Sequence, residues 1–199
     1  MRFHIPLPKY DTENVAYGYW DGAFTEEQLV NTQKYCSKLK LEDAEVGGQE
    51  ANQDGSKRNN KIAWLEYNDD TAELYQIFCD VASRINNQLF NFDLTGMHEQ
   101  IQYSEYNIGE HYGALHQDCG MRNHTYDMPR KLTLTMQLSR PEDYEGGDLK
   151  VRIGENYETF DKKFGKIFIF PSYTLHKVTP VTKGIRKSLV SWIGGPKFK

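Results

Sequence analysis

The sequence predicts a mainly β protein, a β-sandwich or barrel, in which two N-terminal helices cover one sheet. Aromatic residues make up 13% of the chain, with 13 Tyr and 10 Phe, and such residues favour strands over a helical bundle. After Gly96 the spacing of apolar residues changes from helical to alternating. Several short strands with regular turn signals follow, which is typical of a sandwich or barrel.

The N-terminal part of the chain is predicted to contain both helices. The first, over residues 25–40, begins with a capping box at Thr25. The second is indicated by apolar residues that recur at helical spacing over 71–89. Between them, residues 61–67 are predicted to form a short strand, and the polar stretch 45–60 an exposed loop.

The C-terminal part is predicted to consist of short strands. The clearest is 131–139, in which apolar and polar residues alternate, so that one face carries Leu132, Leu134, Met136 and Leu138. The other predicted strands are 98–109, 148–154, 165–171 and 188–194. We expect one domain over 1–199, with helical support over roughly 1–95 and the β core over roughly 96–196.

Composition argues against several classes of partner. The net charge of −4 and the pI of about 5.9 provide no basic stripe for nucleic acid. No apolar run is long enough to cross a membrane, and the first residues do not resemble a signal peptide. Three cysteines are too few for a disulfide framework. We therefore expect a cytoplasmic protein, a monomer or a weak homodimer.

The stretch ALHQDCG places His116 and Asp118 two residues apart. In a strand, positions i and i+2 point to the same face, so the two side chains could contact the same group or ion. They could form half of a divalent metal site or an ordinary hydrogen-bonded pair. The adjacent Cys119 is expected to be a packing residue.

His176 is the candidate third ligand, because it follows the predicted buried strand 165–171 directly after a proline-containing turn. Two histidines and one carboxylate form a facial triad, which leaves positions open on a metal and suits non-haem Fe(II). His111 and His124 have no partner at ligand spacing and are expected to be loop residues.

Ten residues after His176 stands Arg186, in the stretch GIRKSLVSWIGGP that contains the last predicted strand. Its guanidinium could form a bidentate pair with the carboxylate of a small ligand. It could also be a strand-edge cation paired with an acidic residue of the chain.

Three segments, 106–118, 130–151 and 166–196, resemble the Fe(II)/2-oxoglutarate-dependent dioxygenases. Within these, the chain is similar to the prolyl 4-hydroxylase-like group that includes the PKHD-type hydroxylases. The resemblance implies a double-stranded β-helix, a cupin-like jelly roll with helices packed on one sheet. It also implies Fe(2+), 2-oxoglutarate and O2 as cofactors and cosubstrates, with ascorbate as an accessory reductant.

The resemblance implies a role for individual residues. His116, Asp118 and His176 match the iron ligands. The matches for 2-oxoglutarate binding are Arg186, Tyr106, Gln137, Leu149 and Ser188, and those for the substrate pocket are Trp192, Arg130 and Tyr112. Gln137 departs from relatives that have a tyrosine there. Tyr106 and Trp192 could also be ordinary core aromatics.

The implied reaction is hydroxylation of an unactivated C–H bond with release of succinate and CO2, most simply on a prolyl residue of a peptide or protein. Alternatives are a hydroxylase of a free amino acid or other small molecule, a cupin-type metal-binding protein and a nucleic-acid demethylase. Asp118 excludes a halogenase, in which a small residue takes that place. Segments 45–60 and 119–130 are the candidates to close over the site.

Overall fold

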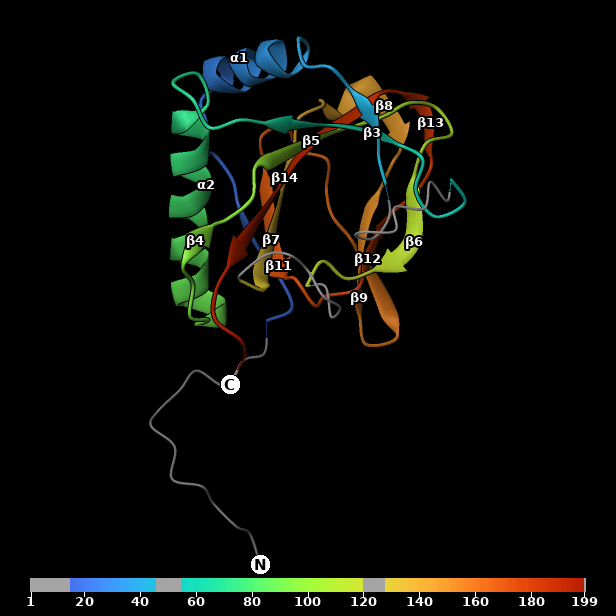
Figure 1. The fold of residues 1–199 in the computed structure, drawn as a ribbon. Helices are drawn as coiled ribbons and strands as arrows, with labels where there is room; N and C mark the ends of the chain where they lie inside the picture. Colours follow the sequence, from blue (N-terminus) through green and yellow to red (C-terminus); the bar gives the residue numbers. More distant parts are fainter. Residues whose placement is uncertain (1–14, 46–54, 120–127, 199) are drawn as a thin grey trace, which may run out of the picture.

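The computed structural model describes residues 15–45, 55–119 and 128–198. Two antiparallel sheets face each other, and two helices pack on the outer face of the larger sheet (Figure 1). This is the predicted arrangement of two N-terminal helices over a β core. No helix in these three segments is both long and apolar enough to span a bilayer.

The larger sheet contains strands from both halves of the chain. From edge to edge its order is β1 (Gly18–Trp20), β11 (Ile167–Pro171), β7 (Arg130–Gln137), β14 (Arg186–Gly194), β5 (Ile101–Tyr106), β3 (Lys61–Leu65) and β2 (Glu42–Asp43), while β4 (Gly96–Met97) pairs with one end of β14. The long neighbours β7 and β14 lie at its centre, so both of their faces are buried.

Alternation along β7 divides its residues between two environments. Leu132, Leu134 and Met136 join the apolar core beneath the helices, as the sequence predicts. The intervening Thr133 and Thr135 are also buried, but point to the opposite face, toward the second sheet. The inner face of the sheet therefore carries buried polar groups, whereas the outer face is apolar.

The helices cover the outer face of the larger sheet. Helix α1 (Glu26–Cys36) begins with the predicted capping box at Thr25 but ends earlier than expected. Helix α2 (Ala72–Ile85) continues into a π-helical turn, η1 (Asn86–Phe90). The buried Asn86 side chain ends this helix, because it donates to the Phe92 carbonyl and accepts from the Phe92 N–H, both at 2.9 Å.

The second layer consists of short strands. The smaller sheet has the order β10 (Asn156–Thr159), β9 (Leu149–Ile153), β12 (His176–Val178) and β6 (Tyr112–His116), and a separate pair joins β13 (Val181–Gly184) to β8 (Tyr144–Gly146) after a 3-10 turn, η2 (Pro141–Asp143). A second, smaller apolar cluster, which includes Leu149 and Phe170, lies between the layers.

The predicted loop 45–60 is only partly described, since residues 46–54 lie outside the described segments. Its C-terminal end is not a free loop. Asn60 is buried, Arg58 forms a β-bridge with Tyr112, and Ala114 donates to the Lys57 carbonyl. Residues 57–60 thus run along the edge of β6. Residues 120–127 of the other candidate closing segment also lie outside the described residues.

One tyrosine on α2 connects the helix to the sheet, which makes the helix–sheet contact testable. The Tyr75 hydroxyl donates to the Leu65 carbonyl and accepts from the Ile101 N–H, on neighbouring strands. Tyr75→Phe leaves both buried backbone groups without this partner, so we expect a loss of about 1–3 kcal/mol in the free energy of unfolding. Urea denaturation measures it.

Tyr35→Phe is the matched control, because the Tyr35 hydroxyl accepts only a 3.3 Å bond from the exposed Asn68 amide. We expect the control to stay within about 0.5 kcal/mol of the parent protein. Equal stabilities for the two variants would show that the Tyr75 hydroxyl does not hold the helix to the sheet.

Candidate metal and cosubstrate site

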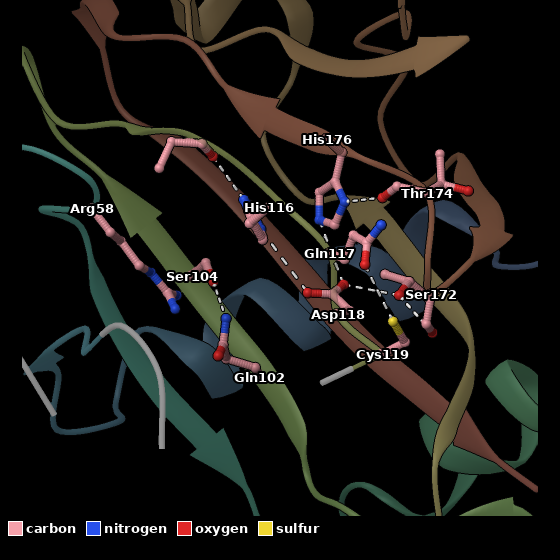
Figure 2. Close-up of polar contacts among 12 residues, drawn as sticks. Arg58, Gln102, Ser104, His116, Gln117, Asp118, Cys119, Ser172, Thr174 and His176 are labelled. Atoms are coloured by element: carbon pink, nitrogen blue, oxygen red, sulfur yellow. Dashed lines mark hydrogen bonds and ion pairs between the residues drawn. The ribbon is translucent and has the colours of Figure 1, made fainter. Parts of the chain in front are cut away.

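His116, Asp118 and His176 come together between the two sheets (Figure 2). His116 ends β6 and His176 begins β12, and the two residues are direct partners across these neighbouring strands. Nε2 of His176 lies 3.5 Å from Asp118 Oδ2, and Nε2 of His116 lies 4.0 Å from Asp118 Oδ1. One donor atom from each side chain lies within 4.8 Å of the others.

Asp118 is positioned differently from the sequence-based expectation. Strand β6 ends at His116, so Asp118 lies in the following loop and not on the same strand. Its backbone N–H donates to the Ser172 carbonyl at 2.8 Å, which holds the loop against the turn that leads into β12. The convergence of the two side chains thus depends on this loop contact and not on strand alternation.

Both imidazoles are oriented in the same way. His116 Nδ1 lies 2.9 Å from the Ala114 carbonyl, and His176 Nδ1 lies 2.9 Å from the Thr174 carbonyl, in each case two residues earlier. A carbonyl oxygen can only accept, so each Nδ1 carries the proton. Each Nε2 therefore presents its lone pair toward Asp118, as a metal-ligating histidine requires.

The protonation states also suit a metal. Burial, followed by the nearby His176, lowers the pKa of His116 to about 4, so this imidazole is neutral at pH 7. Burial raises the pKa of Asp118, but His176, His116, the Arg130 cation and Trp192 together hold the pKa below its ordinary value. A neutral imidazole and an ionised carboxylate are the ligating forms. Two nitrogens and one oxygen form the donor set that suits Fe(II).

Each of the two histidines has an aromatic ring packed beside it. The Tyr112 ring stacks on His116 at 3.6 Å between ring centres, and the Arg58 guanidinium lies 4.7 Å from the centre of the Tyr112 ring. The Phe170 ring lies 4.9 Å from that of His176. Tyr112, which was expected at the substrate pocket, is therefore a direct neighbour of the triad.

Arg186 is buried at the start of β14, with 1% of its surface exposed. Its Nη1 donates to Ser188 Oγ at 3.0 Å, and its guanidinium lies 5.1 Å from the centre of the Tyr106 ring. Its Nε has no hydrogen-bond partner, and no carboxylate among the described residues forms an ion pair with it. This is not the strand-edge ion pair that was the alternative. A buried cation without a counterion is unfavourable, so the site fits an anionic ligand.

Other polar atoms beside Arg186 also have no partner among the described residues. They are the Tyr144 hydroxyl and Gln137 Oε1, both buried. Gln137 lies opposite Ser188 in the sheet, and burial raises the pKa of Tyr144 while the Arg186 cation opposes that shift. Leu149 is buried in the same apolar cluster as Tyr106. These atoms and Arg186 together could bind a carboxylate and its carbon chain.

The EGG turn lets the backbone approach Arg186. Gly147 has a φ of +59°, and a Cβ there would lie 2.9 Å from Arg186 Cδ. A side chain would therefore be strained and would also collide with the arginine stem. This turn follows Tyr144, whose hydroxyl was not among the residues predicted for the site.

Trp192 and Arg130 lie together, but Arg130 is not a lone cation. Its guanidinium stacks on the Trp192 ring at 3.8 Å and pairs with Glu99 through two nitrogens, Nε at 2.6 Å. Trp64 lies 6.2 Å from Trp192 between ring centres and is 41% exposed. The two tryptophans therefore connect the buried site to the surface.

Several polar residues around the triad were not among the residues predicted for the site. Gln102 and Ser104 share a face of β5 with Tyr106, and Gln102 Nε2 donates to Ser104 Oγ at 2.8 Å (Figure 2). Thr133 and Ser172 were also missed. The alternation around Tyr106 could have identified the β5 pair.

The remaining sequence candidates do not belong to the triad, although Cys119 directly follows Asp118 in the chain (Figure 2). His111 accepts from the Gly113 N–H and is not part of the triad, and Cys119 is a free thiol. His124 lies outside the described residues.

Comparison with known proteins places these observations in a family context. Residues 101–194 match the model described as the 2OG-Fe(II) oxygenase superfamily. A PKHD-type hydroxylase of a Synechococcus species is 39% identical over 93 residues, which cover 47% of this chain and 42% of the relative. One from Parvibaculum lavamentivorans is 29% identical over 79% of this chain and 73% of its own length. The chain thus spans less than half the length of the Synechococcus relative.

Two solved structures share the fold. A Pseudomonas putida prolyl-4-hydroxylase superposes with a TM-score of 0.70 at 19% identity, over 90% of this chain and 92% of that one. A Trichoplax adhaerens prolyl hydroxylase, in complex with a hypoxia inducible factor peptide fragment, superposes with a TM-score of 0.70 at 19% identity. The match covers 90% of this chain and 84% of that one. The predicted double-stranded β-helix with helices on one sheet is confirmed.

Removal of one triad imidazole should remove tight metal binding. For His176→Ala we expect a loss of Mn(II) affinity greater than the roughly 10- to 100-fold that is typical of an outer-shell partner, because a ligand itself is lost. Calorimetric titration without cosubstrate measures it. His111→Ala is the control, since His111 lies outside the triad, and should bind Mn(II) as the parent does. Unchanged affinity in His176→Ala would contradict the assignment.

Proposed function

Because residues 101–194 match the model of the 2OG-Fe(II) oxygenase superfamily, we propose that this chain is an Fe(II)- and 2-oxoglutarate-dependent hydroxylase. The observation that carries the proposal is Arg186, a buried cation without an acidic partner among the described residues, close to unsatisfied polar atoms. A cupin-type protein that only binds a metal has no need of this charge.

In this proposal, His116, Asp118 and His176 hold Fe(II). Fe(II), when bound, supplies the oxidation, in which 2-oxoglutarate and O2 become succinate and CO2 and one substrate C–H becomes C–OH. The chain supplies two neutral imidazoles with fixed Nε2 lone pairs and one ionised carboxylate. The superfamily uses Fe(II) and 2-oxoglutarate, and the donor set supports the same use here.

The distal carboxylate of 2-oxoglutarate is proposed to pair with Arg186, with Ser188 as a further donor. Tyr106 and Leu149 remain proposed contacts along the carbon chain. We add Tyr144 to this set, because its buried hydroxyl has no partner among the described residues and is close to Arg186. It would compensate for Gln137, where some relatives have a tyrosine.

The substrate is proposed to be a prolyl residue of a peptide or protein. The names of the PKHD-type relatives and of the two prolyl hydroxylase structures, one with a bound peptide fragment, support this class. Trp64 and Trp192 provide an aromatic surface from the triad to the exterior that could contact a chain on either side of a proline. Arg130 and Tyr112 are proposed to lie beside it.

We further propose that the chain acts as a single domain in the cytoplasm, as a monomer or weak homodimer. The free thiols of Cys36, Cys79 and Cys119 support a reducing compartment. Both helices and the larger sheet share one apolar core, which supports a single folding unit.

Mass spectrometry of reaction mixtures tests the proposed function. Proline-containing peptides and free proline are incubated separately with the protein, Fe(II), 2-oxoglutarate and O2. We expect one oxygen atom to be added to a peptidyl proline, with one succinate formed for each. Oxidation of free proline alone would support the small-molecule alternative. Absence of succinate in all mixtures, with Fe(II) bound, would contradict the oxygenase assignment.

Arg186→Ala should weaken 2-oxoglutarate binding far more than metal binding. Loss of a buried charge partner costs about 2–5 kcal/mol, roughly a 30- to 5,000-fold rise in Kd. Arg186→Lys should keep part of the affinity, because the charge remains but the bidentate geometry is lost. Calorimetry on the Mn(II)-loaded protein measures both. The control is Arg152→Ala, which changes an exposed arginine on β9. An unchanged Kd in Arg186→Ala would make Arg186 a structural cation.

Tyr144→Phe should raise the Kd for 2-oxoglutarate roughly 10- to 150-fold, since a hydrogen bond to a charged group contributes about 1.5–3 kcal/mol. The variant should keep its thermal stability, because the hydroxyl lies beside the Arg186 side chain but forms no hydrogen bond of ordinary geometry with a described residue. The same titration and a melting curve give both values. A lower melting temperature with unchanged Kd would show that Tyr144 is a packing residue only.

A further inference from the structure

A chain of two buried hydroxyls ends on Asp118. Thr133 Oγ1 donates to Asp118 Oδ2 at 2.9 Å, and Thr133 Oγ1 lies 3.1 Å from Ser172 Oγ. Both hydroxyl residues are fully buried, and Figure 2 shows Ser172 and Asp118 side by side below the two histidines. These groups belong to neither the proposed ligands nor the proposed contacts of 2-oxoglutarate.

The direction of the hydrogen bonds follows from the donors available. An ionised carboxylate has no proton, so the single hydroxyl proton of Thr133 goes to Asp118. Thr133 can then only accept from Ser172. The hydroxyls therefore form a one-way chain, Ser172 to Thr133 to Asp118, in which each bond polarises and strengthens the next.

Ser172 also holds the backbone of the same loop. Its carbonyl accepts the N–H groups of Asp118 at 2.8 Å and Cys119 at 3.0 Å. Ser172 lies in the turn between β11 and β12, and Thr133 lies in β7. Asp118 is thus held at its backbone by one segment and at its side chain by another.

We propose that Thr133 is a positioning residue that sets the orientation of the Asp118 carboxylate, supported by Ser172, before the metal binds. Each histidine ring is oriented by a hydrogen bond to a backbone carbonyl. The hydrogen bond from Thr133 orients the Asp118 carboxylate in the same way. The terminal torsion of an aspartate is broad, so a carboxylate without this donor would have to be ordered when the metal arrives. The inference rests on the proposed metal site but not on the reaction.

The alternative is that Thr133 has a purely structural role. A matching substitution at Thr135 distinguishes this role from the positioning of Asp118. Thr135 lies two residues further along β7, on the same face, and is buried opposite Val190. Thr133→Val and Thr135→Val therefore make the same chemical change in the same strand, but only the first removes the donor to Asp118. A general effect of a buried valine would be seen in both.

Mn(II) affinity of the full chain, titrated calorimetrically without 2-oxoglutarate, is the readout. We expect Thr133→Val to lose roughly 10- to 100-fold in affinity, in the range typical of outer-shell partners. Ser172→Ala should lose less, because Thr133 can still donate. Thr133→Ser should recover most of the affinity, since its hydroxyl keeps the bond, and Thr135→Val should bind as the parent does.

Parent-like affinity in Thr133→Val, or an equal loss in Thr135→Val, would overturn the proposal. If Thr133→Val does not fold, Ser172→Ala and Thr133→Ser test the proposal instead. Parent-like Mn(II) binding in Ser172→Ala together with a large loss of affinity in Thr133→Ser would overturn the proposal. The Mn(II) affinities of the variants could follow the expected order although the protein forms no succinate. That result would contradict the proposed function but would still support the role of Thr133.

Discussion

The buried charge of Arg186 is the constraint on which the arrangement of the site depends. A guanidinium without a carboxylate partner among the described residues destabilises the folded chain unless an anion is supplied from outside. The surrounding strands provide no acidic side chain for this charge among the described residues. They provide the Ser188 hydroxyl, which accepts from Arg186, and buried polar atoms that have no hydrogen-bond partner. A ligand that binds only the folded state would offset this cost and add stability.

The pairing of β14 with β7 connects this charge to the triad. Ser188, which accepts from Arg186, lies opposite Gln137, and four residues further along Trp192 lies opposite Thr133, which donates to Asp118. One ladder therefore sets the separation between the proposed carboxylate end and the metal end of the site. The smaller sheet adds only short strands, yet it brings both histidines into register.

The sequence predicted those parts of the molecule that repeat or that lie at known spacings. Alternation identified β7 and the face it turns to the helices, and the positions of His116, Asp118 and His176 identified three side chains that converge in the structure. Helix ends were predicted unevenly. The first helix ends at Cys36 and not near residue 40, whereas the second helix with its π-helical turn ends at Phe90, one residue beyond the predicted 89.

Other features could not be predicted because they depend on contacts between distant segments. Thr133, Ser172 and Tyr144 are single hydroxyl residues with no characteristic spacing, and only the fold brings them to the site. The ion pair between Arg130 and Glu99 spans 31 positions. Strands as short as β6 and β12 have too few residues for alternation to be recognised.

The most direct measurement compares two 2-keto acids as ligands of the Mn(II)-loaded protein. 2-Oxoglutarate and 2-oxopentanoate have the same five-carbon chain and keto-acid end, but only the first has a distal carboxylate. If Arg186 binds that carboxylate, 2-oxoglutarate raises the unfolding temperature and 2-oxopentanoate at the same concentration leaves the unfolding temperature nearly unchanged. Equal shifts for the two acids, or no shift for either, would contradict the account.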